Sequence, residues 1–353
     1  MSTFPSLVRS ASPAGEARYE LGDPLVDRYL EFVAGRCRPN TLTATAFDLK
    51  TFFTVVERDP LAVTSADVFE FLAAQRGDRR VVWMSDRESG LSARTIARRL
   101  STLSGFYAYL VARGDTPVAA NPVPRGLATR RHGGSATSRT VPLVRVPRSL
   151  PKILSPVEVD ALLGALRSWR DRAMVEAMLL GGLRRCEVLG LRLGDVQVAD
   201  RRVFVVDGKG GHQRFTPMAN RFFTSVGRYL DEERPLTDTD RVFVVLKGRR
   251  RGRPLSAAGL DEVLVGARRR GGLTHGTCHQ LRHTCLTRLR EAGMSLEAVQ
   301  AQAGHRSIES TRIYLHLTND WLAEQYQRAA SLIDANQAAV AEMLAAQELV
   351  DAP

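Results

Sequence analysis

The stretch from residue 115 to residue 151 limits this chain to a fold with two separate cores. It is rich in Pro, Gly, Ser, Thr and Arg and shows no apolar periodicity, which is typical of a linker rather than of a packed element. On both sides of it, apolar residues recur at the spacing of helices or strands. We therefore expect two domains, for which a chain of 353 residues is long enough.

The segment before the linker is predicted to form a bundle of helices. Ser92 is a suitable N-cap and Gly114 a suitable C-terminal stop for its last and longest helix. Further helices are expected to begin near Pro24, Asn40 and Ser65. We assign residues 1–20, rich in Ser, Pro and Ala, to a disordered tail, residues 21–126 to the bundle and residues 127–152 to a basic linker.

The segment after the linker mixes helices with a short β-rich region. Ser155 to Glu158 combines an N-cap, a proline at the first helical position and a glutamate at the third, which is a capping box. RRVFVVDGKGGHQRFTPM (201–218) predicts a hairpin around a Gly-Lys-Gly-Gly turn, and residues 240–246 are a candidate third strand. The predicted class is mainly α with a small antiparallel β-sheet (α+β), with one domain over residues 153–320 and a long helix over 321–353.

The charge of the chain restricts its partners. Lys and Arg number 50 against 38 Asp and Glu, a net charge of +12, which indicates nucleic acid or an anionic membrane surface. Most of the excess is arginine, which a GC-rich genome would also produce. No apolar run approaches the length of a membrane span, and four cysteines form no disulfide framework. We therefore expect a cytoplasmic protein with reduced thiols.

The stretch CHQLRHTC (278–285) places two histidines on one helical face, one residue away from the zinc-protease signature H-E-x-x-H. Gln280 stands where such a protease needs its general base, and the cysteines have no partner pair. The stretch therefore predicts no metal site. Taken alone, it would indicate histidines hydrogen-bonded within a core.

Three other motifs change that interpretation. GGLRRCEVLGL (181–191) holds Arg184 and Glu187, GKGG holds Lys209, and AGHRSIESTRIYLH (303–316) holds His305 nine residues before Tyr314. The ordered set Arg, Lys, His-x-x-Arg, Gly-His and Tyr resembles the tyrosine recombinase family, also called phage-type integrases. TLTATAFDLKTFF and SARTIARRLSTLSGFYAYLVARG look like its helical, SAM-like core-binding domain, and residues 153–320 look like its catalytic domain.

The resemblance implies an arginine clamp on a phosphodiester. Arg184 and Arg282 would bind its non-bridging oxygens, as a metal ion does in other phosphoryl-transfer enzymes. Arg185 is a competing candidate, although the family motif favours the residue directly after GGL. The analogy makes Glu187 a carboxylate that orients the arginine side chains.

The resemblance also implies a nucleophile and a general acid. Tyr314 would be the nucleophile, and surrounding positive charge must stabilise its phenolate because a free phenol has a pKa of about 10. Lys209 would be the general acid that protonates the departing 5′ oxygen. His279 would act as proton acceptor or phosphate ligand, and His305 would hydrogen-bond a non-bridging oxygen.

Three nearby residues receive structural interpretations. His283 is expected to pack behind the site, and His212 and Arg214 to lie on the hairpin surface. No cofactor is expected. Arg185-Cys186 departs from the aliphatic-polar pair usual in the family, which leaves the local packing open.

The implied function is site-specific DNA recombination through a covalent 3′-phosphotyrosyl intermediate and a Holliday junction. Integration, excision or transposition of a mobile element is the favoured role; resolution of chromosome or plasmid dimers is the alternative, and a type IB topoisomerase a remoter one. The implied partner is DNA that carries double-stranded recombination sites, and accessory proteins could take part. The protein would be a monomer in solution and a homotetramer on DNA, associated with a bacterial nucleoid. The simple two-domain, Xer-like or transposon-type members fit best, with no arm-binding domain before residue 20.

Arginines in the first domain and in the linker are candidates for phosphate contact. The C-terminal helix would dock on a neighbouring protomer or pack on its own domain. The linker could follow the phosphate backbone. The candidate DNA-binding residues are Arg94, Arg98, Arg99, Arg130, Arg131 and Arg139.

Overall fold

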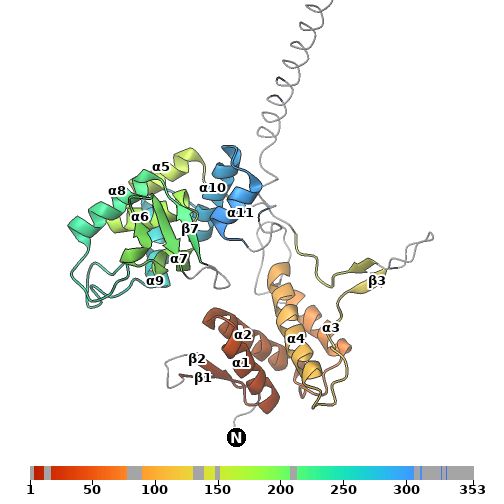
Figure 1. Ribbon diagram of the computed structural model, residues 1–353. Coiled ribbons are helices and arrows are strands. Elements are labelled where there is room, and N and C mark those ends of the chain that lie inside the picture. The colour runs from red at the N-terminus through yellow and green to blue at the C-terminus, as the bar shows by residue number, and fades with distance from the viewer. Residues whose placement is uncertain are drawn as a thin grey trace, which may run out of the picture. The chain divides into compact units, whose positions relative to one another are not determined.

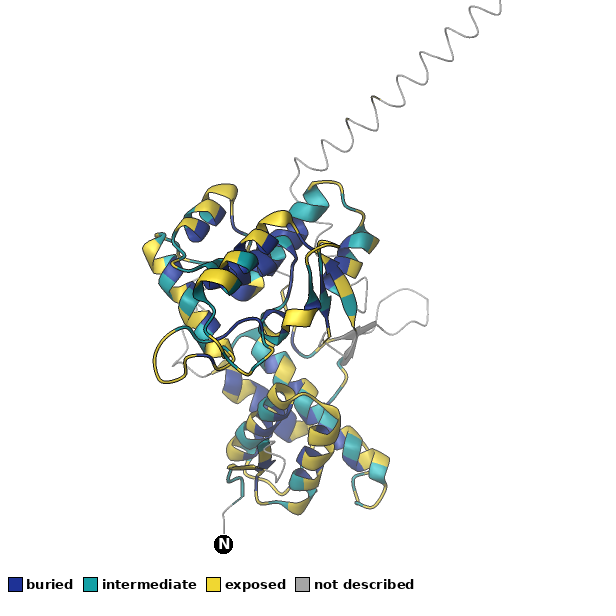
Figure 2. Cartoon of the chain, turned by 60° about the vertical axis from the view of Figure 1, so that its left-hand side comes forward, coloured by how far each residue is buried: buried dark blue, intermediate teal, exposed yellow. Residues whose placement is uncertain are grey.

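The computed structural model describes residues 4–11, 17–77, 90–129, 139–147, 152–206 and 213–305, together with Thr311, Gln327 and Ser331. The chain divides into two compact units, Met1–Arg148 and Ser149–Pro353 (Figure 1). Each unit has its own hydrophobic core, and the buried residues in Figure 2 lie inside the units. The described residues are mainly helical with small antiparallel sheets, which confirms the predicted fold class. None of the described helices is both long and apolar enough to cross a bilayer.

The first unit contains the four predicted helices. Asp23 caps the first of them by accepting hydrogen bonds from the amides of Leu25 at 2.9 Å and Val26 at 3.0 Å. The last begins after the N-cap Ser92 and ends at Gly114, as expected. The helices are α1 (Pro24–Arg36), α2 (Pro39–Val56), α3 (Ser65–Arg76) and α4 (Ala93–Arg113).

The described part of residues 1–20 is not a disordered tail. β1 (Val8–Ala11) pairs antiparallel with β2 (Ala17–Glu20). Tyr19 and Leu21 are buried in the core of the first unit, and the Leu21 amide donates to Asp27 Oδ1 at 2.6 Å. Of these two apolar anchors, Tyr19 lies within residues 1–20, where the overall composition concealed it. The prediction of disorder was wrong for the described residues.

Part of the predicted linker is also structured. β3 (Leu127–Thr129) pairs antiparallel with β4 (Arg139–Val141). Beyond this hairpin, Val144 is buried in the core of the first unit together with Val123. Residues 127–129 and 139–147 of the predicted linker therefore belong to the first unit.

The second unit is built around α6 (Trp169–Leu180), whose residues 173–179 are all buried. This helix packs against α8 (Asn220–Arg228) and α10 (Cys278–Glu291). The predicted capping box is present before α5, because Glu158 Oε2 accepts from the Ser155 amide at 2.8 Å. The other helices are α5 (Pro156–Gly164), α7 (Arg185–Gly190), α8 (Asn220–Arg228), α9 (Ala257–Arg270), α10 (Cys278–Glu291) and α11 (Leu296–Ala303), with a 3-10 turn at Leu193–Asp195 and a π turn at Tyr229–Glu233.

The sheet of this unit has the order β5-β6-β7, with β5 (Val196–Gln197), β6 (Arg202–Val205) and β7 (Arg214–Pro217). β6 and β7 form the predicted hairpin, with Val205 opposite Arg214. The prediction of a third strand over residues 240–246 was wrong. The segment forms only isolated antiparallel bridges, between Arg192 and Arg241 and between Val244 and Pro254. Two of its carbonyl groups accept from side chains: Tyr229 Oη donates to the Val242 oxygen at 2.9 Å, and Arg234 Nη2 donates to the Arg241 oxygen at 3.0 Å.

Candidate active site

The Gly181-Gly182 break turns the chain from α6 into α7. Gly182 has a φ of +65°, a conformation that glycine adopts without strain, and a Cβ there would lie 3.2 Å from Leu286 Cδ2 on α10. The turn brings the Gly182 carbonyl to the guanidinium of Arg282 and places Arg184 at the N-cap of α7. Two motifs 100 residues apart in sequence are joined by this contact.

Arg184 points toward a buried carboxylate. Its Nη1 donates to Glu187 Oε1 at 2.7 Å and its Nη2 donates to the Gly304 oxygen at 3.2 Å. The competing candidate, Arg185, is ion-paired with Asp261 instead. The geometry therefore favours Arg184 over Arg185 as a member of the cluster.

Glu187 is the common partner of three arginines. Its side chain is fully buried, and Oε2 also accepts from the Arg184 amide at 2.9 Å. Arg214 binds both carboxylate oxygens, at 3.0 and 2.9 Å. Arg282 Nη1 lies 4.0 Å from Oε2. We call Arg184, Glu187, Arg214, Arg282 and His305 the arginine cluster.

The surrounding cations keep Glu187 ionised. Burial alone would raise the pKa of this carboxyl, but the hydrogen bonds and charge of Arg214, followed by those of Arg184, lower it to about 2. Glu187 therefore carries its negative charge at any physiological pH, and it offsets part of the positive charge that the arginines bring together.

Arg282 lies in the interior of the second unit, with 4% of the residue exposed. Its Nη2 donates to the Ala303 oxygen at 2.7 Å and to His305 Nε2 at 3.1 Å. These bonds hold the guanidinium of α10 against the C-terminal end of α11. The sequence prediction that Arg184, Arg282 and His305 lie together agrees with this arrangement.

His305 follows Gly304, which ends α11 with a φ of +60°. Burial, and then the charges of Arg282 and Arg184, lower the pKa of His305 to about 4, so the ring is neutral at pH 7. Because a guanidinium can only donate, Nε2 must accept from Arg282. Nδ1 then carries the proton toward Thr311 Oγ1, 3.0 Å away.

Comparison with known proteins identifies the family. Residues 152–320 match the phage integrase family, and residues 26–114 match the N-terminal SAM-like domain of phage integrases. Tyrosine recombinase XerC of Oceanobacillus iheyensis is 30% identical over 319 residues, which cover 88% of this chain and 97% of that protein. The chain belongs to the tyrosine recombinase family. It is thus a member of a family of site-specific DNA recombinases.

Other relatives and solved structures agree with this assignment. Tyrosine recombinase XerD of Listeria monocytogenes serotype 4b is 28% identical to the recombinase over 323 residues, covering 86% of this chain and 97% of that protein. The Tn1549 transposon integrase in complex with transposon right end DNA has the same fold, with a TM-score of 0.64, 19% identity and coverage of 87% and 98% of the two chains. A lambda integrase dimer bound to a COC′ core site gives a TM-score of 0.60 at 19% identity, with coverage of 82% and 93%.

The two histidines of the CHQLRHTC stretch, His279 and His283, are hydrogen-bonded to each other in the recombinase. His279 Nε2 and His283 Nε2 lie 2.8 Å apart, and the rings meet edge to face. His279 is exposed on α10, whereas His283 is half-buried. Burial, and then the charges of His279 and Arg282, lower the pKa of His283 to about 4. His283 therefore hydrogen-bonds directly to His279, whereas the sequence analysis expected it only to pack behind the site.

Two members of the site were not found from the sequence. Arg214 was interpreted as a surface residue of the hairpin, and this was wrong because its side chain is 12% exposed and binds Glu187. Gln302 was not considered; its Nε2 donates to the Gly181 oxygen at 3.0 Å and to the Pro217 oxygen at 3.2 Å. Gln302 thus joins α11 to the Gly-Gly break and to β7.

Lys209, His212 and Tyr314 lie outside the described residues. Of the predicted C-terminal helix, the structure describes only Gln327 and Ser331, both helical. Thr311, three positions before Tyr314, is fully buried and is bonded to His305. The structure therefore describes the arginine cluster and its hydrogen bonds, and the nucleophile and general acid remain predictions.

The candidate DNA-binding arginines of the first unit differ in their surroundings. Arg98 pairs with the buried Asp48, and Arg99 donates to Gln75 Oε1 at 2.8 Å and lies 3.7 Å from Asp48. These two arginines are therefore at least partly engaged in stabilising the bundle. Arg94 is exposed on α4. Arg130 and Arg131 lie outside the described residues, and Arg139 lies in β4.

The thiols beside the site are protonated. Burial raises the pKa of Cys278 to about 11 and that of Cys285 to about 12, and a metal ligand must be the thiolate. Within the described residues, no group of three or more His, Cys, Asp or Glu side chains could hold a metal ion.

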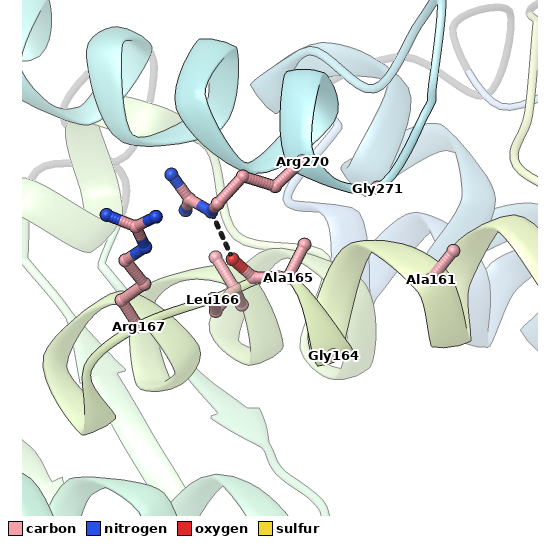
Figure 3. A pocket seen from close by; sticks show the side chains of 7 residues that line it. All are labelled: Ala161, Gly164, Ala165, Leu166, Arg167, Arg270 and Gly271. Atoms are coloured by element: carbon pink, nitrogen blue, oxygen red, sulfur yellow. Dashed lines mark hydrogen bonds between the residues drawn. The ribbon is translucent and has the colours of Figure 1, made fainter.

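A shallow pocket lies where the C-terminal ends of α5 and α9 meet (Figure 3), and none of its lining residues belongs to the arginine cluster. Arg270 Nε donates to the Ala165 oxygen there at 2.9 Å, which satisfies a carbonyl at the end of α5. The pocket therefore reflects helix capping.

The two histidines with lowered pKa should make the stability of the recombinase sensitive to mild acid. Their pKa falls from 6.5 to about 4 on folding, so the unfolded chain binds more protons between these values and stability decreases as the pH falls through this window. We expect His283→Gln/His305→Gln to reduce the decrease in Tm between pH 7 and pH 5 by about a few degrees. Thermal melts across this range check it; an unchanged decrease would contradict it.

Proposed function

We propose that the recombinase cleaves and rejoins DNA through Tyr314. The phenol oxygen attacks the scissile phosphorus, the bond to the 5′ oxygen breaks, and a 3′-phosphotyrosyl bond forms. His279 accepts the phenol proton and Lys209 supplies a proton to the 5′ oxygen. The reverse attack by a 5′ hydroxyl rejoins the strand, and because the phosphodiester energy is kept, no nucleotide cofactor is consumed.

The observation that carries this proposal is the geometry of the turn at the end of α11. Arg184 and Arg282 both donate to carbonyl groups of this turn, and Arg282 also donates to His305. A phosphodiester under attack gathers negative charge on its non-bridging oxygens, and preorganised donors stabilise that charge. Arg184 is held by two bonds from its side chain, has five N–H groups, and is 19% exposed. It is therefore open to a phosphate, while the more buried Arg282 adds charge and orients His305.

The biological role is proposed from the relatives. The matched Xer recombinases align over 97% of their own length, which favours resolution of chromosome or plasmid dimers over the mobile-element role that the sequence analysis placed first. The transposon and lambda integrases share the fold at 19% identity and do not decide the role. Neither the family match nor the relatives support a topoisomerase. We further propose that four protomers act on two sites through a Holliday junction.

Mapping the DNA that becomes covalently attached to the protein tests this function. Sheared genomic DNA from the host is incubated with the recombinase, and fragments that resist denaturing extraction are sequenced. Recovery of one site per chromosome or plasmid supports dimer resolution, and recovery of the two ends of a mobile element supports integration or excision. Two copies of the recovered site on a plasmid should then give deletion or inversion. Relaxation of supercoils without exchange would contradict recombination.

A basic hairpin before α9 is the candidate DNA contact that the structure adds. The turn over residues 247–253 carries five cations, all exposed: Lys247, Arg249, Arg250, Arg251 and Arg253. The turn is well defined, because the Val245 amide donates to the Arg253 oxygen at 2.9 Å and the Gly252 amide to the Val245 oxygen at 2.8 Å. Exposed cations on one hydrogen-bonded turn suit contact with a phosphate backbone.

Neutralising this hairpin should weaken DNA binding through electrostatics. For Arg249→Gln/Arg250→Gln we expect the slope of log affinity against log salt to become less steep by about 0.9 for each phosphate that the hairpin no longer neutralises. Arg192→Gln/Arg202→Gln is the charge-matched control, because both residues already pair with nearby carboxylates. Binding titrations at several salt concentrations measure the slopes. Equal slopes for the two double variants would remove the hairpin from the DNA interface.

A further inference from the structure

Arg214 is a cation on the inward face of a strand. It stands opposite Val205 and is the first residue of β7, five positions after Lys209 in the sequence. Along β7 the half-buried Arg214 and the buried Thr216 alternate with the exposed Phe215 and Pro217. Placing a charge on the inward side of a sheet is unfavourable unless it is paired. Its contacts should therefore show what holds it there.

The pairing partner is the carboxylate at the centre of the arginine cluster. The two Nη groups of Arg214 bind the two oxygens of Glu187 in a fork, at 3.0 and 2.9 Å. Its Nε donates to the Gln302 oxygen at 3.3 Å. One guanidinium thus connects β7 to α7 and to α11.

The same guanidinium lies against the turn that carries His305. A Cβ added at Gly304 would lie 2.8 Å from Arg214 Nη1, so the side chain occupies the space beside this glycine. The Gly304 oxygen accepts from Arg184 Nη2 at 3.2 Å. Arg214 therefore contacts the carboxylate that holds Arg184 and the residue that precedes His305.

We propose that Arg214 is a positioning residue that fixes the hairpin of Lys209 relative to Arg184 and His305. The proposal rests on the proposed function, in which Lys209 protonates the 5′ oxygen. A general acid must come within hydrogen-bonding distance of that oxygen, and Lys209 lies five positions before Arg214. A fork with two fixed hydrogen bonds defines the position of the base of the hairpin, which a single point charge cannot do.

The leaving group distinguishes this role from the alternatives. A 5′ oxygen needs a proton as it departs, whereas a 5′ sulfur departs as a thiolate without one. A variant that misplaces Lys209 should therefore recover on a substrate with a 5′-bridging phosphorothiolate. A variant that weakens only the arginine clamp should not, since the non-bridging oxygens carry the same charge in both substrates.

Single-turnover cleavage by Arg214→Lys tests the proposal. The probe is a nicked duplex with the sequence recovered from DNA trapped on the wild-type protein, made with a 5′-bridging oxygen or sulfur. With oxygen we expect cleavage about 100-fold slower than wild type, the loss that a shift of about 1 Å can cause, at unchanged DNA affinity. With sulfur we expect a deficit of less than about fivefold, because no proton transfer is required.

Three comparison variants complete the experiment. Lys209→Ala should show the same recovery on sulfur, and Arg184→Lys should remain slow on both substrates. Arg202→Gln is the matched control, because Arg202 lies on the same hairpin, pairs with Asp200 and covers the ring of Phe215 at 4.2 Å. It should cleave both substrates at close to the wild-type rate.

The outcomes separate this inference from the proposed function. Absence of a covalent adduct with wild-type protein contradicts the proposed function before any variant is considered. An active wild type with equal losses for Arg214→Lys on oxygen and sulfur overturns the inference alone. If Arg214→Lys does not fold, Gln302→Met replaces it in the same comparison, because Gln302 binds the Pro217 oxygen at the other end of β7. Recovery on sulfur again supports the proposal and equal losses overturn it.

Discussion

Tyr314→Phe abolishes covalent attachment of DNA and strand exchange, whereas noncovalent DNA binding stays within about twofold of wild type. This is the largest effect that the proposed mechanism requires, because the substitution removes only the oxygen that would bond to phosphorus. We expect cleavage below about a thousandth of the wild-type rate, the residual catalysis being what the arginine cluster can provide without a nucleophile. Denaturing gels of end-labelled DNA measure the adduct, and gel shifts measure the binding.

Tyr326→Phe is the matched control for this prediction. Tyr326 is the next tyrosine along the chain, and its substitution by phenylalanine also removes one phenol hydroxyl. It should form the adduct and exchange strands normally. An adduct formed by Tyr314→Phe but lost in Tyr326→Phe would move the nucleophile, while a loss in both would indicate that the substitutions act through the folding of the C-terminal segment.

The resemblance to the family named Arg184, Glu187, Arg282 and His305 as site residues, and the structure places their side chains together. Arg184 and Glu187 lie one helical turn apart because the carboxylate must accept from both the amide and the side chain of the arginine. His305 directly follows the glycine that ends α11, so its place beside Arg282 is also encoded locally. Short motifs therefore carried this part of the prediction.

The inward position of Arg214 could not be predicted in the same way. A strand that reads Arg-Phe-Thr-Pro would normally bury its phenylalanine and expose its arginine. Here Phe215 is 49% exposed and lies beneath the guanidinium of Arg202, while Arg214 faces inward. The reversal depends on Glu187, a partner 27 residues away whose orientation is known only in the folded protein.

The errors in fold prediction have a similar cause. Residues 240–246 read as a strand from their β-branched and aromatic residues, but their backbone pairing is limited to isolated bridges. Tyr229 and Arg234 donate to the Val242 and Arg241 carbonyls, which a strand partner would otherwise occupy. Residues 1–20 read as a tail because the apolar anchor Tyr19 was judged by the composition around it. In both regions, tertiary partners outweighed local propensity.

Glu187→Gln should destabilise the second unit by about 3–5 kcal/mol, the usual effect of leaving buried charges without their partner. The amide keeps the size of the side chain but removes the negative charge shared by Arg184, Arg214 and Arg282. A domain of this size should lose about 10 °C or more in Tm. Because the pKa of Glu187 is about 2, the carboxylate is charged throughout pH 5–8, so the destabilisation should be constant over that range.

Asp240→Asn measures what a surface ion pair contributes in the same unit. Asp240 pairs with Arg192 at 2.7 Å with both side chains more than half exposed, and its loss should cost less than about 1 kcal/mol. Thermal melts of both variants need no DNA, so the comparison is independent of the recombination assay. If Glu187→Gln lowered Tm no more than Asp240→Asn, the three guanidiniums would not depend on Glu187 for their burial. The guanidiniums would then have to be stabilised by their other partners, among them the carbonyl groups of Gly182, Gln302, Ala303 and Gly304.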